Sequence, residues 1–317
     1  MLHDETPPEK IPESQTFSPP IGTRTLDKMN RKLRKAMPTN ADDSLTLEIP
    51  LEVDLFYSKL ARNSVPATNS KSKPLPAFVK IGGFDVSYPE FYESVKRLGC
   101  VSEVVMSAYS AVFNDSIDPQ HSGQFFRKRI AFSPSLAEKF LADPAAFESR
   151  TCLAELKRLQ KSLTISDAHL LFFPLFLKDN QHWVLICINR LHKRFHYFDS
   201  SDSISKDEIL MFSNNLVKNF STCCVDASIW NSNLNYDHGV PIDYPKHKNY
   251  KDSGIYKICY MHLFDGESMK YFDKIYVDQQ RKLLAHKLVN SRLNEVDSIA
   301  LIKKPKVYSW KVKKTSK

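Results

Sequence analysis

The sequence lacks the signals of a secreted protein, a membrane-spanning protein or a protein stabilised by a structural metal. Its six cysteines include no C-x-x-C pair and no matching histidine spacing, which argues against a structural zinc site and against a disulfide framework. The longest apolar run, residues 170–177, is too short to cross a bilayer and contains Pro174. The first residues, MLHDE, have neither the basic start nor the apolar core of a signal peptide. We therefore expect an intracellular protein, nuclear or cytoplasmic, without membrane contact, metal or cofactor, in which most cysteines are buried thiols.

The middle of the chain lacks an excess of basic over acidic residues. Residues 303–317 carry seven lysines and no acid, and residues 24–35 carry six basic residues and one acid. These two segments together have a net charge of +12 against +9 for the whole chain, so the remainder is close to −3. Nucleic-acid binding by the middle of the chain therefore loses support, whereas the ends remain candidates for weak nucleic-acid binding or nuclear import. The alternative is that the C-terminal run is only a solubilising tail.

Composition divides the chain into three parts. Proline, serine and threonine cluster at residues 6–20 and 64–76 without apolar periodicity, so residues 1–76 are predicted to be disordered or weakly structured. Within this part, residues 25–37 are a candidate basic helix and residues 45–60 a candidate docking segment. Residues 77–295 are predicted to form the folded domain, and residues 296–317 a basic C-terminal tail.

The order of elements within residues 77–295 predicts the fold class. A strand near Phe78 and a turn at Gly82 and Gly83 precede helices at 88–98, 101–113, 133–147 and 152–163. A strand at 168–177, a hairpin, a helix at 205–219, a strand at 223–230, a long loop at 231–244 and a helix at 273–294 follow. Helices, then adjacent strands, then helices again predict an α+β domain with a sheet packed against helices.

The hairpin lies in residues 181–200, QHWVLICINRLHKRFHYFDS. Two apolar runs, residues 184–188 and 195–198, have the β-branched and aromatic composition of buried strands and flank a polar turn. If His182 pairs directly with Asp199, the chain reverses between Arg190 and Leu191, inside that polar stretch. A carboxylate beside a histidine fixes the tautomer of the imidazole for acid/base work. The alternative is a surface histidine at a strand end and an aspartate that only forms a turn.

A third element lies downstream, in residues 245–261, PKHKNYKDSGIYKICYM. A polar loop leads through Asp252, a predicted N-cap, into Ser253 and an apolar-periodic helix whose Ile255, Ile258 and Cys259 share one face. A nucleophile in the first helical turn lies where backbone N–H groups and the helix dipole favour negative charge. Asp252 is alternatively only a cap, which is compatible with a catalytic neighbourhood.

These residues together resemble the ubiquitin-like-protein-specific protease family, the SUMO proteases. The motifs are H-W at residues 182–183, D-S seventeen residues later, and N-x-x-D-[C]-G at residues 249–254, with serine in place of cysteine. The resemblance extends from about residue 78 to residue 294: residues 99–109 are similar to the family's entry helix, and residues 281–294 to its closing helix. It implies a papain-like cysteine-protease fold with a central mixed sheet packed against helices, and makes residues 77–295 a catalytic-type domain. It also implies SUMO or another ubiquitin-like protein, and its conjugates, as partner.

The resemblance also assigns roles to single residues. His182 becomes the catalytic histidine and Asp199 its orienting acid, and Ser253 occupies the position of the family's cysteine nucleophile. His247 stands where the family has an oxyanion-stabilising glutamine. Trp183 matches one tryptophan that lines the tunnel for a Gly-Gly tail, and Cys100 stands in place of the other. Trp183 is alternatively a core aromatic, and Asn249 a turn residue.

Three hypotheses follow. The first is a peptidase that retains some cleavage of ubiquitin-like conjugates; the second, which we favour, is a scaffold with weakened or lost catalysis that still binds a ubiquitin-like protein. A serine hydroxyl must lose its proton during attack and needs tighter geometry than a thiolate, which is why the second is favoured. The third is a nucleic-acid-associated protein that acts through its basic tails.

Overall fold

The computed structural model describes residues 45–62, 75–116, 128–202, 204–239, 241–247 and 249–302, all within one unit, Ser44–Lys317. The candidate basic helix at 25–37 and the basic run at 303–317 lie outside the described residues. Among the described helices, none has the length and apolar character needed to span a bilayer. All six cysteines are free thiols, and five of them are buried, as expected; Cys100 is exposed.

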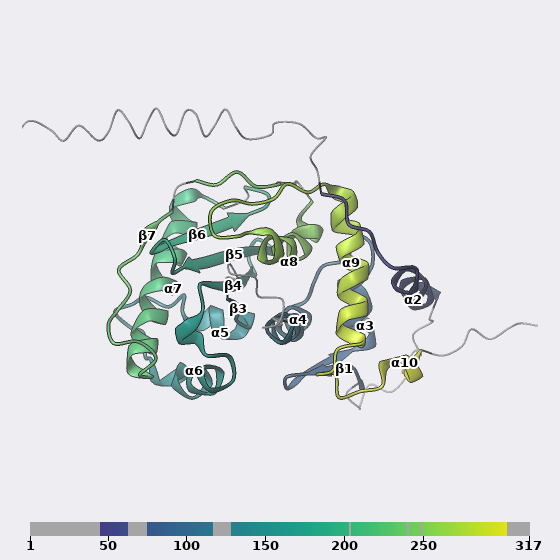
Figure 1. Ribbon diagram of the computed structural model, residues 1–317, viewed down its shortest axis with the longest axis horizontal. Helices are drawn as coiled ribbons and strands as arrows, with labels where there is room; N and C mark the ends of the chain where they lie inside the picture. The colour runs from purple at the N-terminus through teal and green to yellow at the C-terminus, as the bar shows by residue number, and fades with distance from the viewer. Residues whose placement is uncertain are drawn as a thin grey trace, which may run out of the picture. The chain divides into compact units, whose positions relative to one another are not determined.

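A mixed sheet forms the centre of the fold (Figure 1). Its strands are β3 (Arg129–Ala131), β4 (Leu170–Leu177), β5 (His182–Asn189), β6 (Arg194–Asp199) and β7 (Asp237–His238), in that spatial order. Neighbours β4, β5 and β6 pair antiparallel, whereas the two outer strands pair parallel. The α+β class predicted from the element order is therefore confirmed.

The predicted hairpin is present, but its register differs by two residues. Asp199 pairs with Val184, and His182 extends beyond β6 to pair with Leu177 of β4. The turn spans residues 190–193, with Lys193 in the left-handed region at φ 51°. Because side chains alternate along a strand, a shift of two residues leaves His182 and Asp199 on the same face.

Alternation along the strands builds one core on each face of the sheet. On one face Leu171, Phe173 and Ile186 pack against α5 (Pro134–Lys139), α6 (Arg150–Leu163), the short η3 (Ile165–Asp167) and α7 (Lys206–Asp226). The predicted helix at 133–147 is correct only in its first part. The predicted strand at 223–230 was wrong, because Cys223 and Cys224 lie in the last turns of the 21-residue helix α7.

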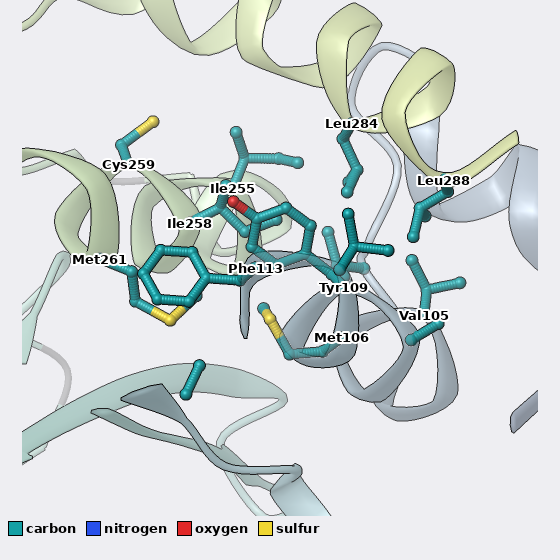
Figure 2. Packing of buried hydrophobic residues seen from close by; sticks show 14 of the residues in the cluster. Val105, Met106, Tyr109, Phe113, Ile255, Ile258, Cys259, Met261, Leu284 and Leu288 are labelled. Atoms are coloured by element: carbon teal, nitrogen blue, oxygen red, sulfur yellow. The ribbon is translucent and has the colours of Figure 1, made fainter. Parts of the chain in front are cut away.

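The other face carries the larger core. Leu170, Phe172 and Leu185 pack beneath α4 (Glu103–Asp115), α8 (Ser253–Leu263) and α9 (Lys274–Val289). Figure 2 shows the side chains of these three helices meeting, among them Tyr109 of α4, Ile255 and Ile258 of α8, and Leu284 of α9. The helical face predicted for residues 255, 258 and 259 is confirmed. This packing fixes the start of α8 against the sheet.

Smaller elements close the outer edge of this core. The hairpin of β1 (Ala77–Ile81) and β2 (Phe84–Ser87) turns at Gly82 and Gly83, both with positive φ, as expected. It leads into α3 (Tyr88–Val95), and α10 (Ser298–Leu301) is tied to β1 through the Ser298 hydroxyl on Phe78 O. Helix α2 (Leu51–Arg62) lies inside the segment predicted to be weakly structured, yet Phe56 and Leu60 are buried in the core. Amphipathic packing against α9, which the sequence reading underweighted, orders this helix.

Candidate active site

The ends of β5 and β6 bring His182 and Asp199 together. The two residues are 1% and 3% exposed, and His182 Nε2 lies 2.7 Å from Asp199 Oδ1. Because an ionised carboxylate only accepts hydrogen bonds, Nε2 carries a proton that it donates to Asp199. The other ring nitrogen, Nδ1, has no hydrogen-bond partner within the described part of the chain. The imidazole is therefore oriented, with one basic nitrogen left over.

Asp199 is held by several donors besides His182. Its Oδ1 accepts from the Ser201 amide at 3.0 Å, and its Oδ2 from the Ile204 amide at 3.3 Å. The Tyr244 hydroxyl bridges the amide and carbonyl of the same aspartate, at 3.2 Å each. Burial alone raises the pKa of Asp199, but the bonds from His182 and Ser201 and the charge of Lys257 outweigh it and hold the pKa well below its usual range. The carboxylate is thus ionised throughout the neutral range.

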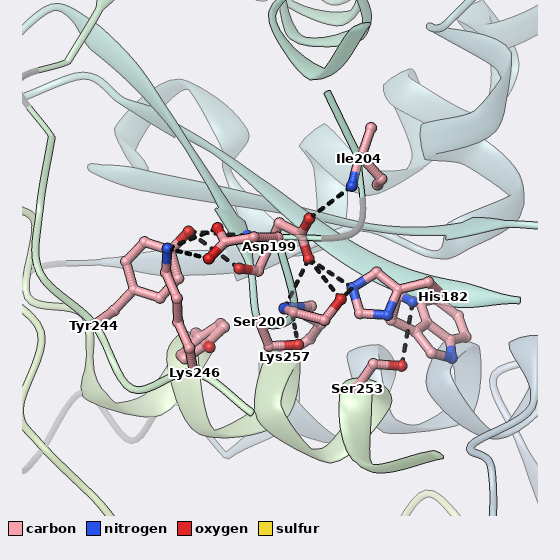
Figure 3. Close-up of polar contacts among 12 residues, drawn as sticks. His182, Asp199, Ser200, Ile204, Tyr244, Lys246, Ser253 and Lys257 are labelled. Atoms are coloured by element: carbon pink, nitrogen blue, oxygen red, sulfur yellow. Dashed lines mark hydrogen bonds and ion pairs between the residues drawn. The ribbon is translucent and has the colours of Figure 1, made fainter. Parts of the chain in front are cut away.

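Ser253 is the first residue of α8 and reaches the same place from the opposite side. Its Oγ accepts a hydrogen bond from the Trp183 backbone amide at 3.3 Å, and the residue is 1% exposed. Figure 3 shows the His182 ring with Asp199 on one side and Ser253 on another. Because Oγ accepts this hydrogen bond, the proton of the Ser253 hydroxyl is free to point elsewhere.

Gly254 explains how the helix start approaches the sheet so closely. A Cβ at this position would lie 2.7 Å from Val101 Cβ and 3.2 Å from Trp183 Cδ1. Only glycine permits this approach of α8 to the β5 strand and the segment before α4. The backbone around Ser253 is therefore set by packing on both sides.

Asp252 does more than the predicted N-cap. It occupies the N-cap position of α8, but its side chain makes no capping bond. Its Oδ1 accepts from Arg281 Nη2 at 2.6 Å and its Oδ2 from Lys274 Nζ at 2.9 Å. Burial raises the pKa of Asp252, but the bonds from Arg281 and Lys274 reverse this and lower it. Asn249, the N-cap of the short helix η4 (Tyr250–Asp252), accepts from the Lys251 amide and donates to Asp252, and so acts within the turn.

Of the two residues assigned to a substrate tunnel, Trp183 lies beside Ser253, and Cys100 precedes Val101, which lies against Gly254. Trp183 is 1% exposed and donates its indole Nε1 proton to Val101 O at 2.9 Å. Cys100 is the neighbour of Val101 in sequence and is exposed. Burial raises the pKa of the Cys100 thiol, although Lys251 and Arg281 pull it down. The thiol is consequently protonated at neutral pH.

His247, at the oxyanion position, comes from the loop before η4. Its amide donates to Ser200 O at 2.7 Å, and its ring lies 3.9 Å from the Tyr256 ring, centre to centre. Both ring nitrogens are buried, and neither has a hydrogen-bond partner among the residues described. Burial, aided by the charge of Lys257, lowers the pKa of His247 to about 4. At neutral pH the ring is neutral and offers one unused N–H donor.

Two residues near this group were missed by the sequence reading. The Ser201 hydroxyl lies 3.3 Å from both His182 Nε2 and Asp199 Oδ1. Lys257, one helical turn after Ser253, is fully buried and donates from Nζ to Ser200 Oγ at 3.0 Å. A lysine within the apolar run IYKICYM was the visible signal for the second.

The arrangement resembles the geometry that general-base catalysis needs. A neutral imidazole, oriented by a carboxylate, is able to take a proton from a nucleophile at a helix N-terminus. The dipole of α8 favours negative charge at its first turn. A hydroxyl there is a weaker nucleophile than a thiol of lowered pKa.

A comparison with known families and structures bears on this site. A model described as the Ulp1 protease family, C-terminal catalytic domain, matches residues 132–273. A structure of the SUMO protease Ulp1 with its catalytic cysteine oxidised to a sulfinic acid is similar at 16% identity and a TM-score of 0.58, over 77% of this chain and 97% of that one. A search of curated proteins found no match.

Two further solved structures agree. The C-terminal Ulp1 protease domain in complex with Smt3, the yeast orthologue of SUMO, gives 16% identity and a TM-score of 0.55 over 77% of this chain and 97% of that one. The Ulp1-like SUMO protease catalytic domain of Chaetomium thermophilum gives 17% identity and a TM-score of 0.53, over 77% and 91% respectively. These likenesses show that the fold is Ulp1-like and papain-like.

Proposed function

This chain belongs to the Ulp1 protease family, and we propose that it recognises the C-terminal tail of SUMO or another ubiquitin-like protein with catalysis weakened or lost at Ser253. The observation that carries the proposal is the buried His182–Asp199 pair, which faces a serine at the start of α8. The Ulp1 domain whose structure contains Smt3 supports this class of partner.

The weakening follows from two residues. His182 and Asp199 supply a base, but the Ser253 hydroxyl must be deprotonated during attack, whereas a thiol ionises beforehand. His247 replaces a glutamine side chain with a ring packed on Tyr256, so its N–H is fixed by that stacking. A ring N–H fixed in this way does not follow the oxyanion as an amide side chain does, and complete loss of an oxyanion donor typically lowers the rate by about 10² to 10³. Together these changes favour binding over turnover.

Recognition is supported by the retained tunnel side chain. Trp183 is locked between Val101 O, through its indole N–H, and the Phe176 ring, whose centre lies 5.2 Å away. In the proposed channel, a preorganised aromatic side chain suits an extended tail of small residues, which presents little more than backbone. Cys100, where the family has a second aromatic residue, is smaller and would leave that side of the proposed channel wider.

The test is binding of SUMO and of ubiquitin, measured by titration calorimetry, to the whole chain. Trp183→Phe removes the indole bond to Val101 and is expected to weaken binding about tenfold, as for a central aromatic contact. Trp230→Phe is the matched control, because Trp230 packs on Phe220 in the core on the other face of the sheet. An unchanged affinity in Trp183→Phe, or equal losses of affinity in both variants, contradicts the proposal.

The basic ends support a second candidate, weak nucleic-acid binding, because residues 303–317 carry seven lysines and no acid. Deletion of this run is then expected to abolish binding to single- and double-stranded DNA and RNA, and the binding is expected to weaken steeply with salt. SUMO binding that persists after the deletion separates this candidate from the first.

A further inference from the structure

Lys257 is a buried charge in the middle of an apolar helix. Its side chain is fully buried, and the residues on either side of it in α8, Tyr256 and Ile258, belong to the hydrophobic core. Its ammonium donates to Ser200 Oγ at 3.0 Å and lies 4.8 Å from the centre of the Tyr260 ring. Three donors with one hydroxyl acceptor and one aromatic face are poor compensation for the hydration that an ammonium loses.

The nearest source of negative charge is the carboxylate at the site. Ser200, which accepts the hydrogen bond from Lys257, is the next residue after Asp199 in the chain. No carboxylate of the described residues lies within ion-pair distance of Nζ, but the attraction of Asp199 is the main influence that favours the charged form. Burial is stronger and lowers the pKa of Lys257 to about 7. Figure 3 shows Lys257 next to Ser200 and Asp199, with Ser253 closer to the His182 ring.

We propose that Lys257 is a positioning residue that competes with His182 for the negative charge of Asp199 and thereby keeps the imidazole neutral before substrate binds. The two side chains approach the region of one carboxylate from different elements: His182 comes from β5, with Nε2 2.7 Å from Asp199 Oδ1, and Lys257 comes from α8, where it donates to Ser200. A carboxylate whose charge is already compensated stabilises an imidazolium less. The inference concerns the site of the proposed function and rests on it for its catalytic meaning.

The consequence depends on the nucleophile. A cysteine works as a thiolate beside an imidazolium, an ion pair that forms before the substrate arrives. A serine keeps its proton until attack and requires a neutral imidazole at rest. The lysine therefore fits the serine at residue 253, and it disfavours the resting ion pair that a thiol at the same position needs.

The protonation states of the other titratable groups that face Lys257 support the same inference. Asp199 approaches from β6, His247 from the loop before η4, and Cys259 and Tyr260 from α8 itself. His247 is neutral near pH 7, and burial raises the pKa values of the Cys259 thiol and the Tyr260 hydroxyl well above their usual range. Asp199 is thus the one ionised partner among these groups in the neutral range.

The experiment introduces a thiol as a reporter of the pair. Ser253→Cys is made with and without Lys257→Met, and the ultraviolet absorbance of its thiolate is followed from about pH 5 to about pH 9 as a difference from the matching Ser253 protein. No reagent or substrate has to enter the site. Lys257→Met is expected to move the midpoint of thiolate formation down by about one pH unit, a tenfold change in thiolate content below the midpoint.

Two controls and one replacement variant decide the outcome. Lys287→Met removes another partly buried lysine, on α9, which no interaction within the described residues joins to Asp199, and it should leave the midpoint unchanged. Lys257→Arg keeps the charge and should keep the parent midpoint, whereas Lys257→Gln replaces Lys257→Met if the latter does not fold. An identical midpoint with and without the charge at residue 257, or one that rises when the charge is removed, overturns the inference. Because the titration uses no ubiquitin-like protein, a failure to bind SUMO is recorded separately.

Discussion

Arg281 joins three segments around the candidate site, and its removal is the sharpest test of how the site is held. The side chain is 1% exposed and lies on α9. Its guanidinium donates to Ser94 O at 3.1 Å and Gly99 O at 2.8 Å, on the segment that carries Cys100. It also donates to Lys251 O at 3.1 Å and Asp252 Oδ1 at 2.6 Å, on the segment that carries Ser253.

Arg281→Met is expected to lower the free energy of unfolding by about 3 to 5 kcal/mol, because it leaves the buried Asp252 carboxylate without its main partner. The matched control is Lys282→Met, the next residue on the same helix. Lys282 pairs with Asp54 at 2.5 Å, but the two side chains are 29% and 49% exposed. Such a surface pair contributes about 0 to 1 kcal/mol. Urea denaturation of both variants at neutral pH measures the difference.

The same variant has a second readout at Cys100. When Gly99 O loses its bond to Arg281, the segment before α4 loses a tether, and Cys100 is expected to react faster with a small alkylating reagent. Equal losses of stability in Arg281→Met and Lys282→Met, or an unchanged rate at Cys100, would refute the assignment of Arg281 as the clamp between the two segments.

Three further outcomes follow from the same contacts. Gly254→Ala places a Cβ 2.7 Å from Val101 Cβ and is expected to destabilise the fold by about 1 to 3 kcal/mol in thermal melts; a neutral effect contradicts the close approach. The pKa of Lys257 is about 7 in the folded protein against an ordinary 10.5. The cost in folding free energy of burying its charge is therefore full below pH 7 and decreases as the pH rises toward 10.5. Lys257→Met should therefore stabilise the protein by up to about 5 kcal/mol below neutral pH and progressively less in alkali, and a pH-independent difference argues against this. Asp199 and Asp252 have lowered folded pKa values, so their stabilisation is present above about pH 4 and lost on further acidification. Asp252→Asn should flatten that acid loss in a pH series of urea midpoints, and an unaltered slope speaks against the assignment.

Much of the fold could be predicted from the sequence, because local patterns of apolar residues determine many of its elements. The apolar runs of β4, β5 and β6 and the periodic face of α8 are strong signals over short windows, and each was predicted. The register of the hairpin was not, because the turn spans four residues and ends with Lys193 in a left-handed conformation. The last turns of α7 were misread as a strand, since a short window around Cys223 hides the length of the helix.

The sequence allowed the candidate site residues to be predicted, but not the contacts that hold them in place. His182, Asp199 and Ser253 were placed by spacing, and the structure brings them together; their catalytic roles remain predictions. Contacts between distant elements, such as Arg281 with Asp252, leave no periodic trace in sequence. The burial of Lys257 is likewise a tertiary property, because a lysine in an apolar helix is equally compatible with a side chain that reaches solvent.

The central claim is that a protease scaffold is retained while its chemistry is weakened at two residues, Ser253 and His247. The most direct measurement is release of a fluorescent reporter from the C-terminus of SUMO and of ubiquitin by the protein, by Ser253→Cys, and by Ser253→Cys combined with His247→Gln. The account predicts that the unchanged protein binds with little or no release, that Ser253→Cys releases the reporter, and that the double substitution releases it faster. If neither substituted protein binds or cleaves either substrate, the channel itself has been lost, and the account of a retained site is contradicted.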